Sequence, residues 1–317
     1  MKKLLSKKTF AAITALLAFF VLPTMVKAQT NEAYAVMDNT AKTLNFYYDT
    51  NKASHTEGVV YTLPDSDTGY PEWCLVYDRK AITTVTIDKS MAKFHPVTTR
   101  LWFDGFQSLT TINGIENLNT DQVTNMGGMF SGCKVLTSLD VSAFKTDKVT
   151  YMDYLFDSCE SLKNIDVSKF DTRSATKMCF MFYGCKGLTS LDVSSFNTQL
   201  VEDMSDMFHD CEALTTIYCN DTWTCEMSIS MFKDCKLLKG GENGSISYDE
   251  GKIDITMANP TTGYFTKKGS TNIDFQKAEN KSINNGVFTL QGVRLGDTLD
   301  NIQAGIYIVN GKKVVKR

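Results

Sequence analysis

The sequence predicts an α/β solenoid whose repeats, about 26 residues long, each supply one short strand and one helix. Two observations support this prediction. Apolar residues recur in columns along the chain, and within each repeat their spacing changes from every second residue to every third or fourth. The first spacing is typical of a strand with one buried face, and the second is typical of an amphipathic helix.

The apolar columns define the repeat. Neighbouring members of the first column are 24 to 27 residues apart, and they are Ile82, Leu109, Leu136, Leu162, Leu188, Leu214 and Leu238. A second column follows three positions later, with Val85, Ile112, Leu139, Ile165, Leu191 and Ile217. A period of this length indicates stacked repeats, because no single repeat of this size can bury its own apolar face.

The strand half of the repeat is clearest in the segment LTSLDVS at residues 136–142. Leu139 and Val141 alternate there with Asp140 and Ser142. We therefore expect the apolar pair to face the core and the polar pair to face away from it.

The helical half is expected to begin near Thr146, a suitable N-cap. Its apolar residues, spaced by three, three, one and three, are Val149, Met152, Leu155, Phe156 and Cys159. This spacing favours one stripe of a helix. An alternative stays open, in which the methionine, phenylalanine and cysteine stripes lie on tight turns of a more β-rich solenoid.

The regions around the solenoid (residues 82–240) differ from it in pattern. Residues 29–81 are predicted to form a β-rich N-terminal cap with a hairpin, in which Leu44, Phe46 and Tyr48 alternate, and Trp73 and Trp102 are expected to be packing residues. Residues 241–266 are predicted to form the C-terminal cap, closing on Tyr264 and Phe265. Terminal caps are expected because a stack of repeats otherwise exposes its core at both ends.

The last residues predict a separate small β segment. Residues 267–283 are polar and are predicted to be a linker, and residues 284–317 contain short β-like runs. Asn310-Gly311 stands between two of these runs and is a strong hairpin signal.

The first 28 residues are predicted to be a signal peptide. Four lysines precede an apolar run from Phe10 to Leu22, and Ala28 offers a small residue for cleavage before Gln29. The run is short for a membrane span, so we expect no transmembrane segment in the mature chain. Residues 1–28 hold five lysines and no acid, so their removal would change the net charge from −3 to −8. A mildly acidic chain without a basic cluster is not expected to bind nucleic acid.

Catalytic motifs are absent from the sequence. None of the three histidines has metal-ligand spacing, and there is no Gly-rich phosphate loop and no nucleophile motif. We therefore predict that the protein is not an enzyme and needs no cofactor or metal.

One cysteine recurs in each repeat, at Cys133, Cys159, Cys185, Cys211 and Cys235. If each stands at a helix end, helix spacing of about 8–10 Å places neighbours beyond disulfide reach. We favour buried free thiols for this column, whereas a disulfide stays open for the local pair Cys219 and Cys225.

A polar column runs along the predicted strands and provides the candidate partner-binding residues. It contains Asp140, Asp166 and Asp192, each followed two positions later by Ser142, Ser168 or Ser194, and Tyr218 takes the next place. Like charges on adjacent strands repel, so hydrogen bonds within the chain, a bound cation or a basic partner must offset the repulsion. We favour internal hydrogen bonds.

The repeat motif V-x-x-M-x-x-M-F-x-x-C-x-x-L-x-x-L-D-V-S, over about residues 82–240, resembles the BspA-like leucine-rich repeat family of bacterial surface proteins. The resemblance implies a leucine-rich-repeat-like solenoid that is displayed on the cell surface and binds proteins, and it transfers no catalytic residue. The runs GVFTLQG and GIYIVNGKKVVKR resemble the C-terminal sorting segment of Bacteroidetes type IX secretion cargo, although they are shorter than the usual domain.

The sequence thus predicts a secreted or cell-surface protein of a Gram-negative bacterium. Its solenoid is expected to bind an extracellular protein ligand in adhesion, such as a host matrix protein or the surface of a neighbouring cell. The alternative is a glycan-binding surface module of a nutrient-uptake system. Exposed aromatic residues on the strand face would favour glycans, whereas an acidic, hydroxyl-rich face favours protein.

Overall fold

The computed structural model describes residues 30–66 and 70–268, and the backbone of four short strands beyond them. The chain divides into two compact units, of which the first ends at Lys268 and the second begins at Gly269. The predicted signal peptide lies outside the described residues, and so does the predicted linker from residue 269 onward. The strands of the first unit are β1 (Glu32–Asp38), β2 (Thr43–Asp49), β3 (Val59–Thr62), β4 (Thr84–Ile87), β5 (Thr111–Asn113), β6 (Ser190–Asp192), β7 (Thr216–Tyr218), β8 (Lys239–Gly240), β9 (Ile246–Ser247) and β10 (Phe265–Thr266).

The first unit begins with a five-stranded sheet in the order β3-β1-β2-β4-β5. β1 and β2 form the predicted hairpin, and β2, β4 and β5 then pair in parallel. Trp73 and Trp102 pack against Phe46 of β2 and are fully buried. The ring of Phe46 stacks on that of Trp102, with centroids 5.1 Å apart. Both tryptophans are therefore packing residues, as the sequence predicted.

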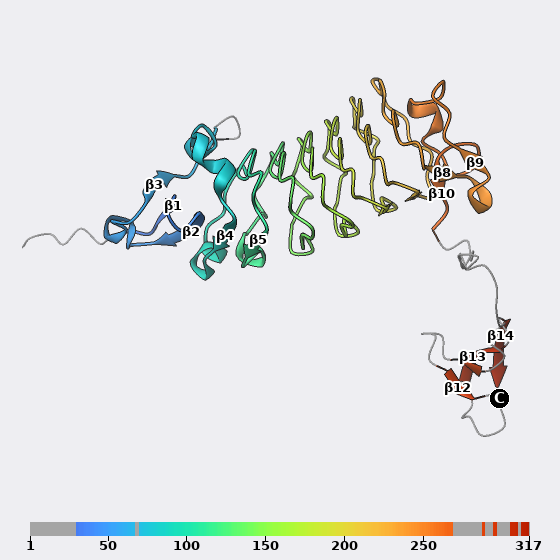
Figure 1. Cartoon of the computed structure of the whole chain (residues 1–317), viewed down its shortest axis with the longest axis horizontal. Helices are drawn as coiled ribbons and strands as arrows, with labels where there is room; N and C mark the ends of the chain where they lie inside the picture. The colour runs from blue at the N-terminus through green and yellow to red at the C-terminus, as the bar shows by residue number, and fades with distance from the viewer. Residues whose placement is uncertain are drawn as a thin grey trace, which may run out of the picture. The chain divides into compact units, whose positions relative to one another are not determined.

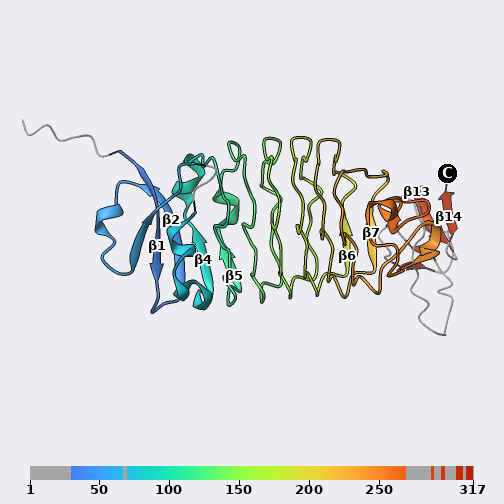
Figure 2. The same cartoon turned by 90° about the horizontal axis from the view of Figure 1, so that it is seen from above.

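The repeats lie side by side in one row after this sheet, as the green and yellow loops of Figures 1 and 2 show. Isolated parallel bridges join each repeat to the next, in the series Thr98, Asn125, Tyr151, Lys177, Asp203 and Met227. Neighbouring members of this series are about one sequence repeat apart. Equivalent residues of successive repeats are therefore in contact.

The predicted fold class is wrong, because the described residues contain no α-helix. Their helices are short 3₁₀ turns: η1 (Lys52–Ser54), η2 (Glu72–Cys74), η3 (Tyr77–Ala81), η4 (Lys89–Lys93), η5 (Ile115–Asn117), η6 (Glu242–Gly244) and η7 (Ile255–Met257). None of them covers a methionine, phenylalanine and cysteine stripe. These stripes lie on tight turns, which is the alternative that the sequence left open.

Left-handed residues explain why the stripes cannot be helical. Each repeat places two residues with positive φ four positions apart, such as Gly128 (62°) and Gly132 (72°), or Tyr154 (58°) and Ser158 (54°). A right-handed helix requires negative φ at every residue, so residues with positive φ cannot be part of one. For a non-glycine residue the left-handed conformation costs about 1–2 kcal/mol. The same positions recur at Phe180 and Gly184, at Asp206 and Asp210, and at Ser230 and Asp234.

The backbone amides of these turns divide between two sets of partners. The N–H groups of Gly128, Phe130 and Gly132 donate to carbonyls of the next repeat, at distances of 2.7–3.0 Å. The N–H groups of Met129, Ser131 and Cys133 donate to the residue three positions earlier in their own repeat. The pattern repeats at residues 154–159, so these buried amides are satisfied without a helix.

The core follows the predicted columns. Met152, Leu155, Phe156 and Cys159 are fully buried, and so are their equivalents in the neighbouring repeats. The phenylalanines form a continuous stack, with centroids 5.4–5.8 Å apart between successive members. The stack contains Phe103, Phe130, Phe156, Phe182, Phe208 and Phe232.

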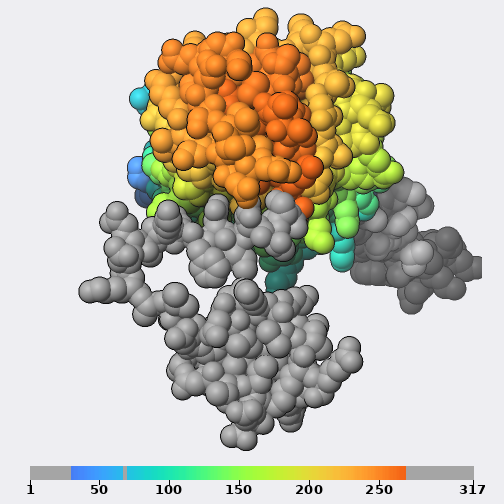
Figure 3. Space-filling view, turned by 90° about the vertical axis from the view of Figure 1, so that its right-hand side faces the viewer, coloured from blue at the N-terminus to red at the C-terminus, as the bar shows by residue number. Residues whose placement is uncertain are grey.

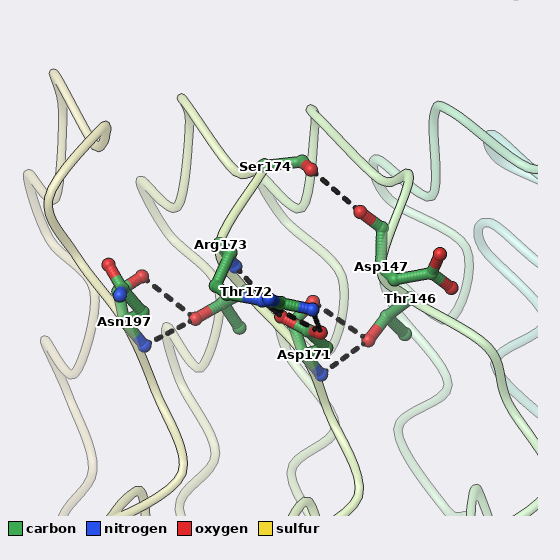
Figure 4. Close-up of polar contacts among 7 residues, drawn as sticks. All are labelled: Thr146, Asp147, Asp171, Thr172, Arg173, Ser174 and Asn197. Carbon is green, nitrogen blue, oxygen red and sulfur yellow. Dashed lines mark hydrogen bonds and ion pairs between the residues drawn. The ribbon is translucent and has the colours of Figure 1, made fainter.

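Buried threonines also join the repeats (Figure 4). Thr172 Oγ1 donates to the carbonyl of Asn197 at 2.9 Å and accepts from its N–H at 2.7 Å. Thr146 makes the same pair of bonds to Asp171. The expected N-cap at Thr146 is therefore wrong, because its hydroxyl bridges to the next repeat and no helix follows it.

The last residues of the first unit close the phenylalanine stack. Tyr264 and Phe265 are fully buried, and both rings contact Phe232 edge to face. Figure 3 shows this end as a continuous surface, in orange. β10 joins the sheet β10-β7-β6, and β8 pairs with β9 beside it.

The second unit contains β11 (Val287–Phe288), β12 (Arg294–Gly296), β13 (Gly305–Val309) and β14 (Lys312–Lys316) in the sheet order β12-β11-β13-β14. β13 and β14 pair antiparallel, as the hairpin signal predicted. The turn at Asn310-Gly311 itself lies outside the described residues.

We predict that Phe156→Ala lowers the free energy of unfolding of the first unit by about 3–5 kcal/mol, because it opens a cavity between two stacked rings. The control is Leu200→Ala, where the side chain is 59% exposed and the change should be small. Urea denaturation measures both. Equal stability of the two variants would contradict the stacked core.

We predict that Thr172→Val destabilises the protein by about 1–3 kcal/mol, because the valine leaves the N–H and C=O of Asn197 without partners. Thr172→Ser keeps the hydroxyl and should lose less. Thermal unfolding of the two variants separates the hydroxyl from the methyl group. A serine variant as unstable as the valine variant would argue against the bridge.

Candidate functional site

The predicted polar column faces away from the core. Asp140, Asp166 and Tyr218 are exposed, and Asp192 is half-buried. Between them the apolar residues Val141, Val167 and Val193 are buried. The alternation deduced from the sequence is therefore present, and the column forms a polar row on the strand side of the repeats.

Each aspartate of this row accepts a hydrogen bond from the serine two residues later. The N–H groups of Ser142, Ser168 and Ser194 donate to the Oδ1 atoms of their aspartates at 2.9–3.0 Å. Hydrogen bonds from Ser142 and Ser168 lower the pKa values of Asp140 and Asp166. Internal hydrogen bonds are thus present, as we favoured, and they stabilise the charged carboxylates.

Asp192 differs from the other two because it has a cationic partner. Lys268 Nζ lies 2.5 Å from Asp192 Oδ2. Burial raises the pKa of Asp192, but hydrogen bonds from Lys268 and Ser194 outweigh it, and the net pKa is lowered. The same ion pair raises the pKa of Lys268. No residue pattern indicates this contact, because Lys268 lies in the predicted linker.

The backbone segments that carry this row are only partly paired with one another. β5 is the last strand of the N-terminal sheet, and β6 begins the next ladder with β7 and β10. The equivalent segments in between, 138–140 and 164–166, form no strand and share no ladder. In contrast, the isolated bridges through Asn125, Tyr151 and Lys177 continue through all these repeats. We call this side, which carries the turns with left-handed residues, the turn side.

A groove of about 620 Å³ lies where the ladder is interrupted. Three consecutive repeats line it, with Thr110, Thr111, Ile112 and Ile115 from the first, Ser138, Leu139 and Asp140 from the second, and Asn164, Ile165 and Asp166 from the third. Its volume lies within the range of roughly 300–1,000 Å³ that is usual for ligand sites. The sequence identified Asp140 and Asp166 but not the groove, because the interruption of the ladder changes no residue pattern.

The groove also explains a difference within the second apolar column. Leu191 and Ile217 are fully buried neighbours in the paired strands β6 and β7. Leu139 is only partly buried, and Ile165 keeps 7% of its surface exposed. Both side chains line the groove, so the column is less completely covered where the strands are unpaired.

The cysteine column consists of buried free thiols. Each Sγ donates to a phenylalanine carbonyl of the preceding repeat at 2.9–3.3 Å. Burial raises the pKa of Cys133, Cys185 and Cys211 well above its usual value, so these thiols stay protonated. The predicted helix spacing was the wrong reason for excluding disulfides, since no helix separates the repeats. Cys219 and Cys225 are free as well.

Neither a metal site nor a membrane span is apparent in the described part of the chain. No group of three or more histidine, cysteine, aspartate or glutamate side chains there could hold a metal ion. No helix there is long and apolar enough to cross a bilayer.

Comparisons with known proteins match the repeats without assigning a function. Residues 99–223 match a family described as "Mycoplasma protein of unknown function, DUF285", which covers less than half of the chain. No curated protein matches the sequence.

Two solved structures resemble the chain, and both are bacterial leucine-rich repeat proteins. The protein from Eubacterium ventriosum ATCC 27560 is 19% identical, with a TM-score of 0.34, and the match covers 73% of this chain and 51% of that protein. The protein from Bacteroides ovatus ATCC 8483 is 17% identical, with a TM-score of 0.28, and the match covers 66% of this chain and 69% of that protein. The chain thus spans about half the length of the first. Both TM-scores are low, so we base no functional argument on them.

We predict that Lys268→Met raises the pKa of Asp192 and leaves the pKa of Asp140 unchanged. NMR titration of the carboxyl carbons measures both. The ion pair stabilises the protein above the unfolded-state pKa of aspartate, about 3.9, and this contribution is lost as the pH falls through the lowered folded-state pKa. An unchanged Asp192 titration would contradict the ion pair.

Proposed function

We propose that this chain is an exported, non-enzymatic protein-binding module, and that its row of aspartates and serines contacts the partner. The main support is the exposure of this row. Asp140 and Asp166 face away from the core, accept hydrogen bonds only from the serines of their own turns, and make no ion pair with the described residues. Their remaining carboxylate oxygens are available to a ligand.

The chemistry of the row favours a basic or polar protein surface. Carboxylates and hydroxyls recur once per repeat, so a partner meets a regular line of hydrogen-bond acceptors. Ion pairs at an exposed surface contribute about 0.2–1 kcal/mol each and are screened by salt. Binding through the row is therefore the sum of several weak contacts and decreases with ionic strength.

The glycan alternative receives less support from this row. Tyr218 is its single aromatic side chain, and it is 36% exposed. Sugar-binding surfaces commonly offer aromatic faces for stacking, whereas the remaining six residues of the row are aspartates and serines. A glycan array nevertheless belongs in the test.

Export is proposed from the sequence of residues 1–28, which combines a basic start, an apolar run and a small residue at the predicted cleavage position. We propose a secreted or cell-surface location on this basis, with delivery by a type IX route as the finer proposal. Its partner is then an extracellular protein, on host matrix or on a neighbouring cell.

We predict that the triple variant Asp140→Asn, Asp166→Asn and Asp192→Asn keeps the fold but binds its partner roughly tenfold more weakly at low salt. Asparagine still accepts the serine N–H, so the turns should persist. The measurement is binding of the purified protein to a panel of host matrix proteins and to a glycan array, at low and high salt.

The matched control removes three exposed carboxylates elsewhere, with Asp65→Asn, Asp147→Asn and Asp221→Asn. It carries the same change in net charge and should bind almost normally. The proposal fails if both triple variants bind alike, or if glycans bind and no protein does.

A further inference from the structure

The groove suggests a more specific occupant than the row alone. The segments 138–140 and 164–166 make no ladder with each other or with β5. Their edges face the neighbouring repeats, which hydrogen bonds hold together on either side, from Ser161 N–H to the carbonyl of Lys134 and between Thr146 and Asp171. A ligand in the groove is therefore recognised through side chains.

The chain itself shows how a lysine binds to this row at a later repeat. β10 is an extended segment that pairs in parallel with β7, through Phe265 opposite Ile217 and Thr266 opposite Tyr218. Two residues after this strand, Lys268 reaches the third aspartate of the row, Asp192. β10 thus ends the ladder beside β7, and the lysine that follows it pairs with the row.

Charge and apolar surface at the groove suit the same kind of ligand. Asp140 and Asp166 lie at the groove and make no ion pair with the described residues, while Ile112, Leu139 and Ile165 line it. A lysine or arginine can lay its aliphatic stem along apolar side chains and keep its charged end at the carboxylates.

We propose that this groove binds an extended segment of a partner protein whose lysine or arginine pairs with Asp140 and Asp166 and packs its aliphatic stem on the apolar lining. This inference rests on the proposed function, since it names the contact within the same polar row. Acidic segments are rejected by the two carboxylates.

The test uses two fluorescent hexapeptides and the full chain, with fluorescence anisotropy as the readout. The first peptide alternates valine and lysine, and the second replaces lysine by glutamate. We expect the second to bind at least roughly tenfold more weakly than the first. Equal binding of the two peptides, or no binding of the first, would overturn the proposal.

Variants locate the binding in the groove. Asp140→Asn with Asp166→Asn should weaken binding of the first peptide roughly two- to thirtyfold at low salt, as expected for two exposed ion pairs, whereas Asp147→Asn should not. Asn164→Trp should fill the groove and block binding, while Thr137→Trp places the same bulk beside it. Circular dichroism and thermal unfolding confirm that each variant is folded.

The outcomes separate this inference from the proposed function. If matrix proteins bind through the aspartate row but the peptide ignores Asn164→Trp, the groove inference is overturned and the proposed function stands. If the full chain self-associates in sedimentation and the Asp140 and Asp166 variants prevent it, the occupant is a second copy, which overturns the assignment to a foreign partner.

Discussion

The division of backbone amides within the turns determines most of this structure. Around Gly128 and Gly132, alternate N–H groups bond within the repeat and across to the next one. This pattern requires a left-handed residue at two places in each repeat, and it satisfies polar groups that are buried among methionine, phenylalanine and cysteine side chains. The phenylalanine stack and the threonine bridges add to a register that these amides already set.

The turn-side ladder also permits the groove on the strand side. Because the repeats are joined continuously through Asn125, Tyr151 and Lys177, the strand segments need not pair in order to keep them together. The ladder is complete from β6 to β10 and interrupted between β5 and β6. A surface with unpaired edges can therefore exist on a stack that is stable without it, and there a ligand can bind without disturbing the core.

The sequence predicted which side chains are buried better than it predicted the backbone. The columns that include Met152, Phe156 and Cys159 are buried as expected, because apolar periodicity reports burial directly. The helix was wrong because spacings of three and four also fit two successive turns with left-handed residues. Gly128, Gly132 and Gly184 indicate such turns, but the equivalent positions in another repeat are Tyr154 and Ser158, residue types that rarely adopt a positive φ. The glycines therefore do not recur as a pattern. The groove exists because the strand segments between β5 and β6 make no ladder hydrogen bonds, and no residue pattern in the sequence indicates their absence.

The central claim is that the repeats are fastened on the turn side and open on part of the strand side, and hydrogen exchange tests it most directly. The amides of Gly128, Phe130 and Phe156, and those of β7, should be strongly protected in the full chain, whereas those of residues 138–140 and 164–166 should exchange rapidly. If the amides of residues 138–140 and 164–166 exchange as slowly as those of β7, the ladder is closed there and the account is contradicted.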